Sequence, residues 1–538
     1  MNKQSAKRRE DDDGSAIAID RLYQLPQPIL HHILSLLSQR DAVRTSVLSK
    51  SWRYLWHGRL NVEFRDNWFA RKTEIWPFLD KTLQRYLDQN LSLQKFLVDI
   101  NHYNVDFVLL RKWIPVFIMN MGVRSLSLIF HWNRTNTIVF PRPLVIFQSE
   151  SLVELHLQGC DLSTLKSTDN VMLYNLQTLR LHYVYVTDEL FEKIISGCPL
   201  IENLDLLECT GLKSIKLHKH HNIKDFDCSV NDDQTIIDFE DPHPLESVRI
   251  RNCLNCYLRH KNMHFTHLKS LDLYKVHLPA ETFDKFSSFF PCLSELILHS
   301  CDGLKEFRLI SSSIKRLTIK MDQINPGKGI KAFIDTPNIL YFEFSVDDLF
   351  LPSIKFTTTS NEWKSQISLW YMPKRSDKDA TSWFLKLNKL LESLSQSHIT
   401  LNLFYDMYQK LFMHINDSYG SFYKPVVVED LKLSGCVSSS FDPTILNSFL
   451  RICHPWHIHM DMHGEVRDKC NLIGYISKLI PYEKGCFWLR DLEEVSTEVW
   501  NMKAKEWHCV KGTILPALRM QQKIRFRLTW KEQLSKFT

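Results

Sequence analysis

The stretch SGCPLIENLDLLECTGLKSIKL (196–217) decides the predicted fold, because it contains one repeating unit almost in full. Its apolar residues follow the order apolar-x-x-apolar-x-apolar at Ile201, Leu204 and Leu206. A small apolar residue, Cys209, follows three positions later. Alternation of apolar and polar residues is typical of a short strand with one buried face. A single unit of this size cannot bury its own apolar face, so the pattern predicts similar units stacked beside it.

The same unit recurs through the middle of the chain. Neighbouring copies begin about 22–30 residues apart, or about half that distance, which is the size range of leucine-rich repeats. Long steps leave room for a strand and a helix, with helices expected at 188–195 and 282–289, whereas short steps leave room for a strand and a turn. The sequence therefore predicts an irregular α/β leucine-rich-repeat solenoid, a horseshoe, over residues 91–350. Clear copies begin at Leu152, Leu176, Ile201, Leu245, Leu268 and Leu293, and looser copies at Leu93, Val123, Leu212, Ile223, Leu304, Ile314 and Ile339.

The alternative to a solenoid is an unrelated α/β domain whose strands happen to fit the pattern. The number of copies with one shared internal order argues against it. In a solenoid, the residues between the apolar positions line the concave face, and here they are mixed in charge and rich in hydrogen-bonding groups. Such a surface suits protein binding, although each residue can also be a solvated strand residue without a role. The candidate target-binding residues are His156, Arg180, Asp205, Arg249, Arg251, Asp272, Tyr274, Glu295, Arg316 and Lys320.

A second pattern precedes the repeats, in LPQPILHHILSLLSQRDAVRTSVLSKSWRYLW (25–56). Pro28 suits the first turn of a helix, and the apolar residues after it recur at helical spacing. Asp41 can cap a second short helix. Trp52 and Trp56 lie four residues apart, on one face of a third. Three short amphipathic helices cannot bury all this surface among themselves, so they pack on the rest of the chain or offer a face to a partner.

These residues resemble the F-box, most closely its plant form, which runs from Leu-Pro through a helix and a polar break to Val-Leu-Ser-x-x-Trp-x-x-Leu-Trp. Gln27 departs from that form, which commonly has an acidic residue there. The repeats at 196–217 and 290–309 likewise resemble those of plant F-box/leucine-rich-repeat (F-box/RNI-like, FBD-related) proteins. The resemblance implies a small three-helix, all-α F-box that docks on the Skp-type adaptor of a cullin–RING ligase, while some of its residues pack the module's own core. The implied adaptor contacts are Leu25, Pro26, Ile29, Leu30, Ile33, Leu34, Val43, Val47, Leu48, Trp52 and Trp56.

The repeat signal fades in the C-terminal region. A helix at 383–394, a strand at 399–404 and a further repeat strand from Val428 predict that this α/β region continues or caps the solenoid. A helix over 441–453 and an alternating strand over 456–462 follow. The expected organisation is a disordered tail at 1–17, an F-box at 18–60, a helical linker or cap at 61–90, the solenoid at 91–350 and the C-terminal region at 351–538.

The C-terminal region also concentrates histidine and cysteine. His457 and His459 would fall on the same face of a strand and could supply two zinc ligands. The spacing of the whole group matches no compact zinc motif, however, and FLRICHP with CFWLRDLEEV is similar to the C-terminal tail of the plant proteins. We therefore expect neither a metal nor a cofactor. The group comprises Cys453, His454, His457, His459, His463 and Cys470.

The overall composition excludes several classes of protein. Hydrophobic residues make up 44% and charged residues 24%, as in ordinary folded proteins. The net charge of +6 is not concentrated in a basic patch beyond residues 7–9, so we expect no direct binding to nucleic acid. Asn120 and Arg124 interrupt the longest apolar stretch, which predicts no membrane partner. The odd number of cysteines, 13, and the lack of a signal-peptide pattern predict reduced thiols in the nucleus and/or cytoplasm.

The sequence contains none of the common catalytic motifs, such as a Walker A loop, HExxH or GxSxG, so we expect a non-catalytic protein. The resemblance implies the substrate-recognition subunit of an SCF-type ubiquitin ligase, with an unknown target protein. Two other hypotheses remain open. One is a repeat-based scaffold that does not direct degradation. The other is a co-receptor for a small ligand, which would need the cations Arg249, Arg251, Arg316 and Lys320 to converge.

Overall fold

The structure is a computed structural model, and the chain divides into two compact units, Met1–Lys213 and Ser214–Thr538. Each unit is described by itself below. The structure describes residues 25–37, 39–45, 47, 52, 55–56, 58–68, 75–101, 105–131, 138–139, 143–166, 168–217, 222–230, 235–239, 244–253, 256–257, 264–278, 281–321, 330–346, 351–370, 380–405, 424–435, 444–462, 487–510 and 523–531.

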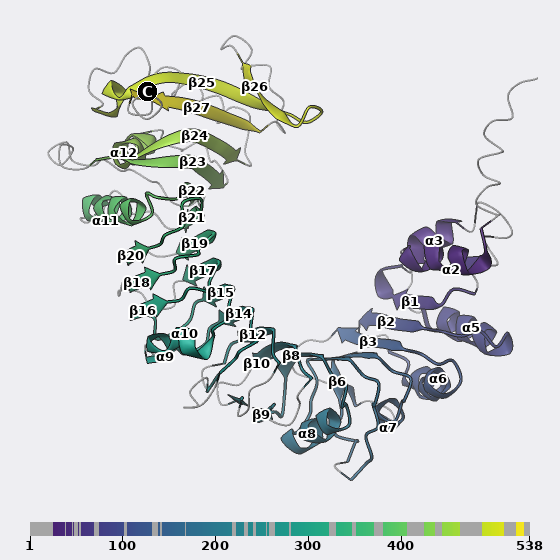
Figure 1. Ribbon diagram of the computed structural model, residues 1–538. Coiled ribbons are helices and arrows are strands. Elements are labelled where there is room, and N and C mark those ends of the chain that lie inside the picture. The colour runs from purple at the N-terminus through teal and green to yellow at the C-terminus, as the bar shows by residue number, and fades with distance from the viewer. Residues whose placement is uncertain are drawn as a thin grey trace, which may run out of the picture. The chain divides into compact units, whose positions relative to one another are not determined.

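The first unit begins with short helices and continues as a ladder of parallel strands (Figure 1). The predicted linker at 61–90 contains the first strand of this ladder as well as a helix. The helices are α2 (Gln27–Leu36), α3 (Gln39–Thr45), α5 (Ile75–Asp88), α6 (Phe107–Met119), α7 (Pro143–Phe147) and α8 (Asp188–Ser196), with a 3-10 turn η1 (Asp66–Trp68). The ladder runs β1 (Asn61–Arg65), β2 (Lys95–Asn101), β3 (Ser125–His131), β5 (Glu154–Gln158), β7 (Thr178–His182) and β8 (Asn203–Cys209), and β4 (Ile138–Val139) pairs with β6 (Cys160–Asp161).

The second unit contains a longer parallel ladder that ends in three antiparallel strands (Figure 1). The parallel order is β10 (Asp225–Val230), β12 (Ser247–Arg251), β14 (Ser270–Tyr274), β15 (Glu295–His299), β17 (Arg316–Met321), β19 (Tyr341–Val346), β21 (Lys364–Leu369), β22 (His398–Tyr405), β23 (Val426–Gly435) and β24 (Cys453–Met462). The antiparallel strands are β27 (Ile524–Trp530), β25 (Leu492–Asn501) and β26 (Glu506–Val510). The helices are α9 (Glu281–Asp284), α10 (Phe286–Phe289), α11 (Ala380–Ser393) and α12 (Thr444–Ile452), with a 3-10 turn η5 (Phe487–Arg490).

Alternation along each strand separates the core from an open face. Leu271 and Leu273 of β14 are buried and stand in register with Leu296 and Leu298 of β15. Successive side chains of a strand point to opposite sides, so the residues between these leucines lie on the other side of the sheet. We call that side the open face. The buried leucines of one repeat thus pack on those of the next, as the repeat pattern predicted.

The half-length spacing contains a strand and a turn, as the sequence predicted, and the structure shows which sheet each of these strands joins. The copies that begin at Leu212 and Leu304 do not add strands to the main ladders. They form strands of two smaller parallel sheets instead, because the same alternation can bury an apolar face from the opposite side of the core. One small sheet is β9 (Ser214–Lys216), β11 (Ile236–Asp238) and β13 (Cys256–Tyr257); the other is β16 (Glu306–Ile310), β18 (Lys331–Asp335) and β20 (Ser353–Thr357).

The C-terminal part extends the repeat ladder. Strands β21 to β24 continue in parallel register, and the antiparallel strand β27 pairs with β24. Helix α11 packs near β20 and α12, so helices cover one side there. The helix expected at 282–289 is split into α9 and α10. In the described part of the chain, no helix has both the length and the apolar character that crossing a bilayer requires.

Candidate functional site

The N-terminal helices enclose a small apolar core. Leu30 and Leu34 of α2 pack with Ala42 of α3 and with Trp52 and Leu55, and all five are at most 7% exposed. The first turn of α2 contains a proline, where the missing N–H costs no hydrogen bond. A buried core of this kind holds the helices in a fixed arrangement, so that the module can present a defined surface.

The predicted adaptor contacts divide into three groups by exposure. Leu30, Leu34 and Trp52 are core residues. Leu48 lies outside the described residues. Leu25, Ile33 and Trp56 are half-buried against the core, whereas Pro26, Ile29, Val43 and Val47 are exposed. Leu36, which the sequence analysis did not select, is 74% exposed, and its spacing of seven residues from Ile29 places both on one side of α2.

The helical module is joined to the repeat ladder by a buried arginine. Arg59 is 5% exposed and its guanidinium donates a hydrogen bond to the carbonyl of Leu37. The hydroxyl of Tyr86 on α5 donates to the carbonyl of Arg59 at 2.5 Å. Burial lowers the pKa of Arg59, and burial raises the pKa of Tyr86 to about 12. These contacts fix the end of the module against the first helix of the ladder.

On the open face of the first unit, the structure brings the predicted residues His156, Arg180 and Asp205 together. Register places them side by side on β5, β7 and β8. His182 joins them: its Nδ1 lies 3.2 Å from Nε2 of His156, and its Nε2 lies 2.9 Å from a carboxylate oxygen of Asp205. Burial, followed by the neighbouring His182 and Arg180, lowers the pKa of His156 to about 4. His156 is therefore neutral at pH 7.

The open face of the second unit carries a ladder of ion pairs. Arg249 bridges Asp227 at 2.9 Å and Asp272 at 3.0 Å, and Arg251 lies 3.3 Å from Asp227. The hydrogen bond that Arg249 donates to Asp227, aided by the one that it donates to Asp272, raises the pKa of Arg249 against the opposing effect of burial. Tyr274 lies on the same face of β14. Arg249 and Asp272 are therefore engaged with each other across the strands, Arg251 contacts Asp227, and the ring of Tyr274 packs against that of His299.

The ladder continues through the next strands. Arg316 lies 3.3 Å from Glu295, and its guanidinium stands over the ring of Tyr341 at 4.8 Å from the centroid. Lys320 lies 3.1 Å from Glu343. Cross-strand pairs of opposite charge stabilise a sheet, but exposed pairs contribute little each. The predicted cations thus have partners along the ladder and do not converge on one point.

Beyond the ladder, the open face presents an aromatic pair that the sequence analysis missed. Trp370 is 50% exposed and stacks on Phe404 with ring centroids 3.8 Å apart and planes 3° apart. Its indole N–H donates to the hydroxyl of Ser345 at 3.2 Å. Alternation in KSQISLW, the sequence of β21 and the next residue, puts Trp370 on the same side as Gln366 and Ser368. This alternation can be read from the sequence, but it lies beyond residues 91–350, where the repeats were expected.

At the end of the parallel ladder, two of the histidines noted above meet a carboxylate. His457 and His459 of β24 flank Asp430 of β23, with Nδ1 of His457 at 3.4 Å and Nε2 of His459 at 2.8 Å from its Oδ1. Burial would raise the pKa of Asp430, but hydrogen bonds and charge from the two histidines outweigh it and hold that pKa below its usual value.

The rest of the predicted histidine–cysteine group does not join this cluster. His454 is buried and stacks on Trp530 at 3.9 Å between centroids. Cys453 is buried and donates to the carbonyl of Phe449. His463 and Cys470 lie outside the described residues. The three residues Asp430, His457 and His459 offer ligand atoms that lie within 4.8 Å of one another, so they could hold a metal ion.

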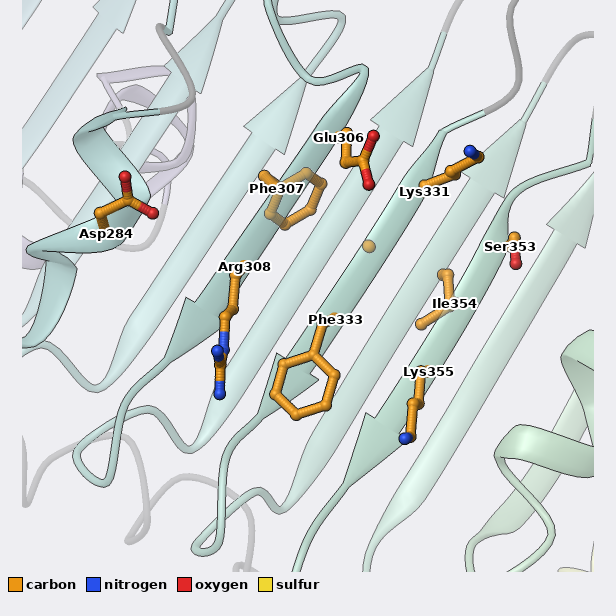
Figure 2. Close-up of a pocket in the computed structure, with 10 residues that line it drawn as sticks. Asp284, Glu306, Phe307, Arg308, Lys331, Phe333, Ser353, Ile354 and Lys355 are labelled. Carbon is orange, nitrogen blue, oxygen red and sulfur yellow. The ribbon is translucent and has the colours of Figure 1, made fainter.

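A shallow groove lies over the small sheet β16–β18–β20 (Figure 2). In its middle row, Arg308 and Lys355 flank the ring of Phe333, with their charged groups 4.8 and 5.8 Å from its centroid. Glu306 and Lys331 stand in the next row along these strands. The groove therefore mixes both charges near one aromatic ring.

Comparisons with known proteins identify the two parts of the chain. The family model "F-box domain" matches residues 22–62, and the model "At1g61320/AtMIF1, LRR domain" matches residues 88–324. Similar proteins of Arabidopsis thaliana include F-box/LRR-repeat protein At3g59200, which is 34% identical over 201 residues. The match covers 36% of this chain and 37% of the relative.

Two further relatives from the same plant show a similar extent of likeness. Putative F-box/LRR-repeat protein At3g18150 is 31% identical over 44% of this chain and 48% of its own length. Putative F-box protein At1g49610 is 32% identical over 38% of this chain and 49% of its own length. The chain thus spans less than half the length of each of these three relatives. These matches confirm the prediction that the chain carries an F-box and leucine-rich repeats and resembles plant F-box/LRR-repeat proteins.

Proposed function

We propose that this chain, which carries an F-box and a leucine-rich-repeat domain, is the substrate-recognition subunit of an SCF-type cullin–RING ubiquitin ligase. The F-box docks on the Skp-type adaptor and, through it, on the cullin and RING subunits, while the repeats hold a target protein. Ubiquitin transfer takes place on the other subunits. The chain contributes proximity, which raises the effective concentration of the target at the site of transfer.

The observation that carries the proposal is the apolar surface outside the module's closed core. Ile29 is 46%, Leu36 74%, Val43 42% and Val47 84% exposed. Large apolar side chains that stay exposed outside the described core favour binding to a partner. Helices that present such a face bind in apolar grooves. We therefore assign adaptor docking to these exposed residues with Pro26, and core packing to Leu30, Leu34 and Trp52.

The test is adaptor binding by two matched variants. Ile29→Asp places a charge in the proposed contact, and we expect binding about 30-fold weaker, the effect of a hot spot worth about 2 kcal/mol. Leu87→Asp makes the same kind of change at a residue of α5 that is 40% exposed, and we expect no loss. The measurement is titration of the folded full chain with purified Skp-type adaptor. Equal affinities of wild type and Ile29→Asp would contradict the assigned contact. A folded wild type that does not bind the adaptor would contradict the ligase function.

We propose that the target contacts the open face of the second unit, with Trp370 as an anchor. The ion pairs of the ladder already satisfy most predicted charges, so a target would have to displace them. A rigid, exposed tryptophan loses little entropy on binding and is a typical hot spot. Once a target is known, Trp370→Ala should weaken its binding at least about tenfold. Leu340→Ala, at a residue 54% exposed, is the control and should bind normally.

The two competing hypotheses differ in what they require. A scaffold that does not direct degradation would lack adaptor binding, so the titration with the Skp-type adaptor distinguishes it from a ligase subunit. A small-ligand co-receptor needs converging cations, but Arg249, Arg251, Arg316 and Lys320 each face a carboxylate. This arrangement does not favour the co-receptor. The nuclear or cytoplasmic location stays a prediction, which imaging of a tagged full-length chain would test.

A further inference from the structure

We propose that Asp430, His457 and His459 form a binding site for a divalent transition-metal ion of the zinc type. His457 and His459 are two residues apart on β24, so both side chains lie on one face of the strand. The parallel register of β23 puts Asp430 directly opposite His457. Two histidines and a carboxylate on neighbouring positions are a ligand set that binds zinc and related ions.

The distances fit a metal ion with small adjustments. Zinc binds nitrogen and oxygen ligands at about 2.0–2.1 Å, so tetrahedral ligand atoms stand about 3.4 Å apart. Oδ1 of Asp430 is 3.4 Å from Nδ1 of His457 and 2.8 Å from Nε2 of His459, and all three ligand atoms lie within 4.8 Å of one another. For an ion between them, Oδ1 of Asp430 and Nε2 of His459 would have to separate by about 0.6 Å, and the nitrogens of His457 and His459 would have to stand about 3.4 Å apart as well.

One nitrogen of the cluster makes at most a weak hydrogen bond. Nδ1 of His457 is buried, and its neighbour Oδ1 of Asp430 stands at the long limit of such a bond. A neutral histidine presents a lone pair at one ring nitrogen and carries its proton at the other. A metal ion would use this buried lone pair. The three side chains are 20–24% exposed, so an ion can enter from solvent and keep a coordination position open.

The surrounding charges lower the expected affinity without closing the site. Arg525 and Arg527 of β27 pair with His459 and His457, and Lys432 stands beside His459 on β23. Arg525 is neutralised by Glu498 of β25 at 2.6 Å and lies over the ring of Trp507. Arg527 is exposed, so solvent screens its charge. We therefore expect affinity in the micromolar rather than the nanomolar range.

The experiment compares zinc binding among matched variants of the full chain. Each protein is freed of metal with a chelator and titrated with Zn²⁺ at pH 7.5 in a calorimeter. Asp430→Asn and the double variant His457→Gln/His459→Gln should each bind one equivalent fewer than wild type. His398→Gln is the control, because His398 forms a similar half-exposed pair with Glu429 at 3.2 Å on the neighbouring strands. It should bind as many equivalents as wild type.

A second measurement distinguishes a built site from scattered thiols and histidines. Co²⁺ gives visible absorption bands whose intensity reports low coordination number, and these bands should be lost in Asp430→Asn and kept in His398→Gln. Circular dichroism establishes that each variant is folded. Equal stoichiometry in wild type and Asp430→Asn, or a wild type without cobalt bands, would overturn the proposal. The outcome is independent of adaptor binding.

Discussion

Two clusters of two histidines and one aspartate lie on the open faces of the two units, and they differ in where the carboxylate stands. In the first unit the order is His156, His182, Asp205, so the carboxylate reaches only the second histidine. In the second unit Asp430 lies between its two histidines and contacts both. The two clusters also differ in their properties: burial keeps His156 neutral in the first, whereas in the second the ligand atoms gather around a carboxylate.

The largest expected effect is acid sensitivity of the first cluster. The pKa of His156 is lowered to about 4, so between pH 6.5 and 4 the unfolded state binds more protons and stability falls as the pH falls. The full effect is on the order of 3 kcal/mol. Hydrogen exchange of β5 and β7 at pH 7, 5.5 and 4.5 measures it locally. In His156→Gln the loss over this window should vanish, and an unchanged slope in that variant would contradict the assignment.

Removal of the carboxylate should affect the second cluster more than the first. Asp430→Ala leaves two histidines without their shared acceptor, and we expect a loss of about 2 kcal/mol in metal-free buffer. Asp205→Ala removes one contact at a side chain that is 31% exposed, and we expect about 1 kcal/mol or less. Chemical denaturation of the two variants at pH 7.5 gives the comparison. A larger loss in Asp205→Ala would reverse the proposed roles of the two carboxylates.

The two clusters also show what the sequence could and could not predict. Period-two alternation is a local signal, so it correctly predicted that His457 and His459 share one face of a strand. The carboxylate that joins them comes from another strand, 27 residues before His457, and only the register of β23 and β24 places it there. In the first cluster, His156, Arg180 and Asp205 each lie between the apolar positions of a clear repeat, so the same alternation predicts all three on one face, and the strand register then places them side by side.

Because alternation and helical spacing are local signals, they also could not predict which sheet a strand joins or which side of a helix is exposed. Alternation at Leu304 predicted a strand but could not show that it joins β18 and β20 rather than the main ladder, because both sheets bury the same kind of face. In the F-box, helical spacing marked Ile29 and Leu30 alike. Their exposures are 46% and 4%, a distinction that depends on how α2 packs against Trp52.

The smallest expected effect separates the causes of the lowered pKa of His156. Burial is the main cause and His182 the next, while Arg180 lowers the pKa further and Asp205 raises it. Arg180→Gln should therefore raise the titration midpoint of His156, and Asp205→Asn should lower it. Each change should amount to about a few tenths of a pH unit, because solvent screens charges on an open face.

The measurement is NMR titration of the His156 ring proton in the two variants and in wild type. Added salt should shrink both shifts, since screening acts on charge and leaves burial unchanged. Shifts of opposite sign would establish that charge tunes a midpoint set mainly by burial. Two shifts of the same sign would mean instead that either substitution changes the packing of β5 against β7, and that the carboxylate's position is not what distinguishes the two clusters.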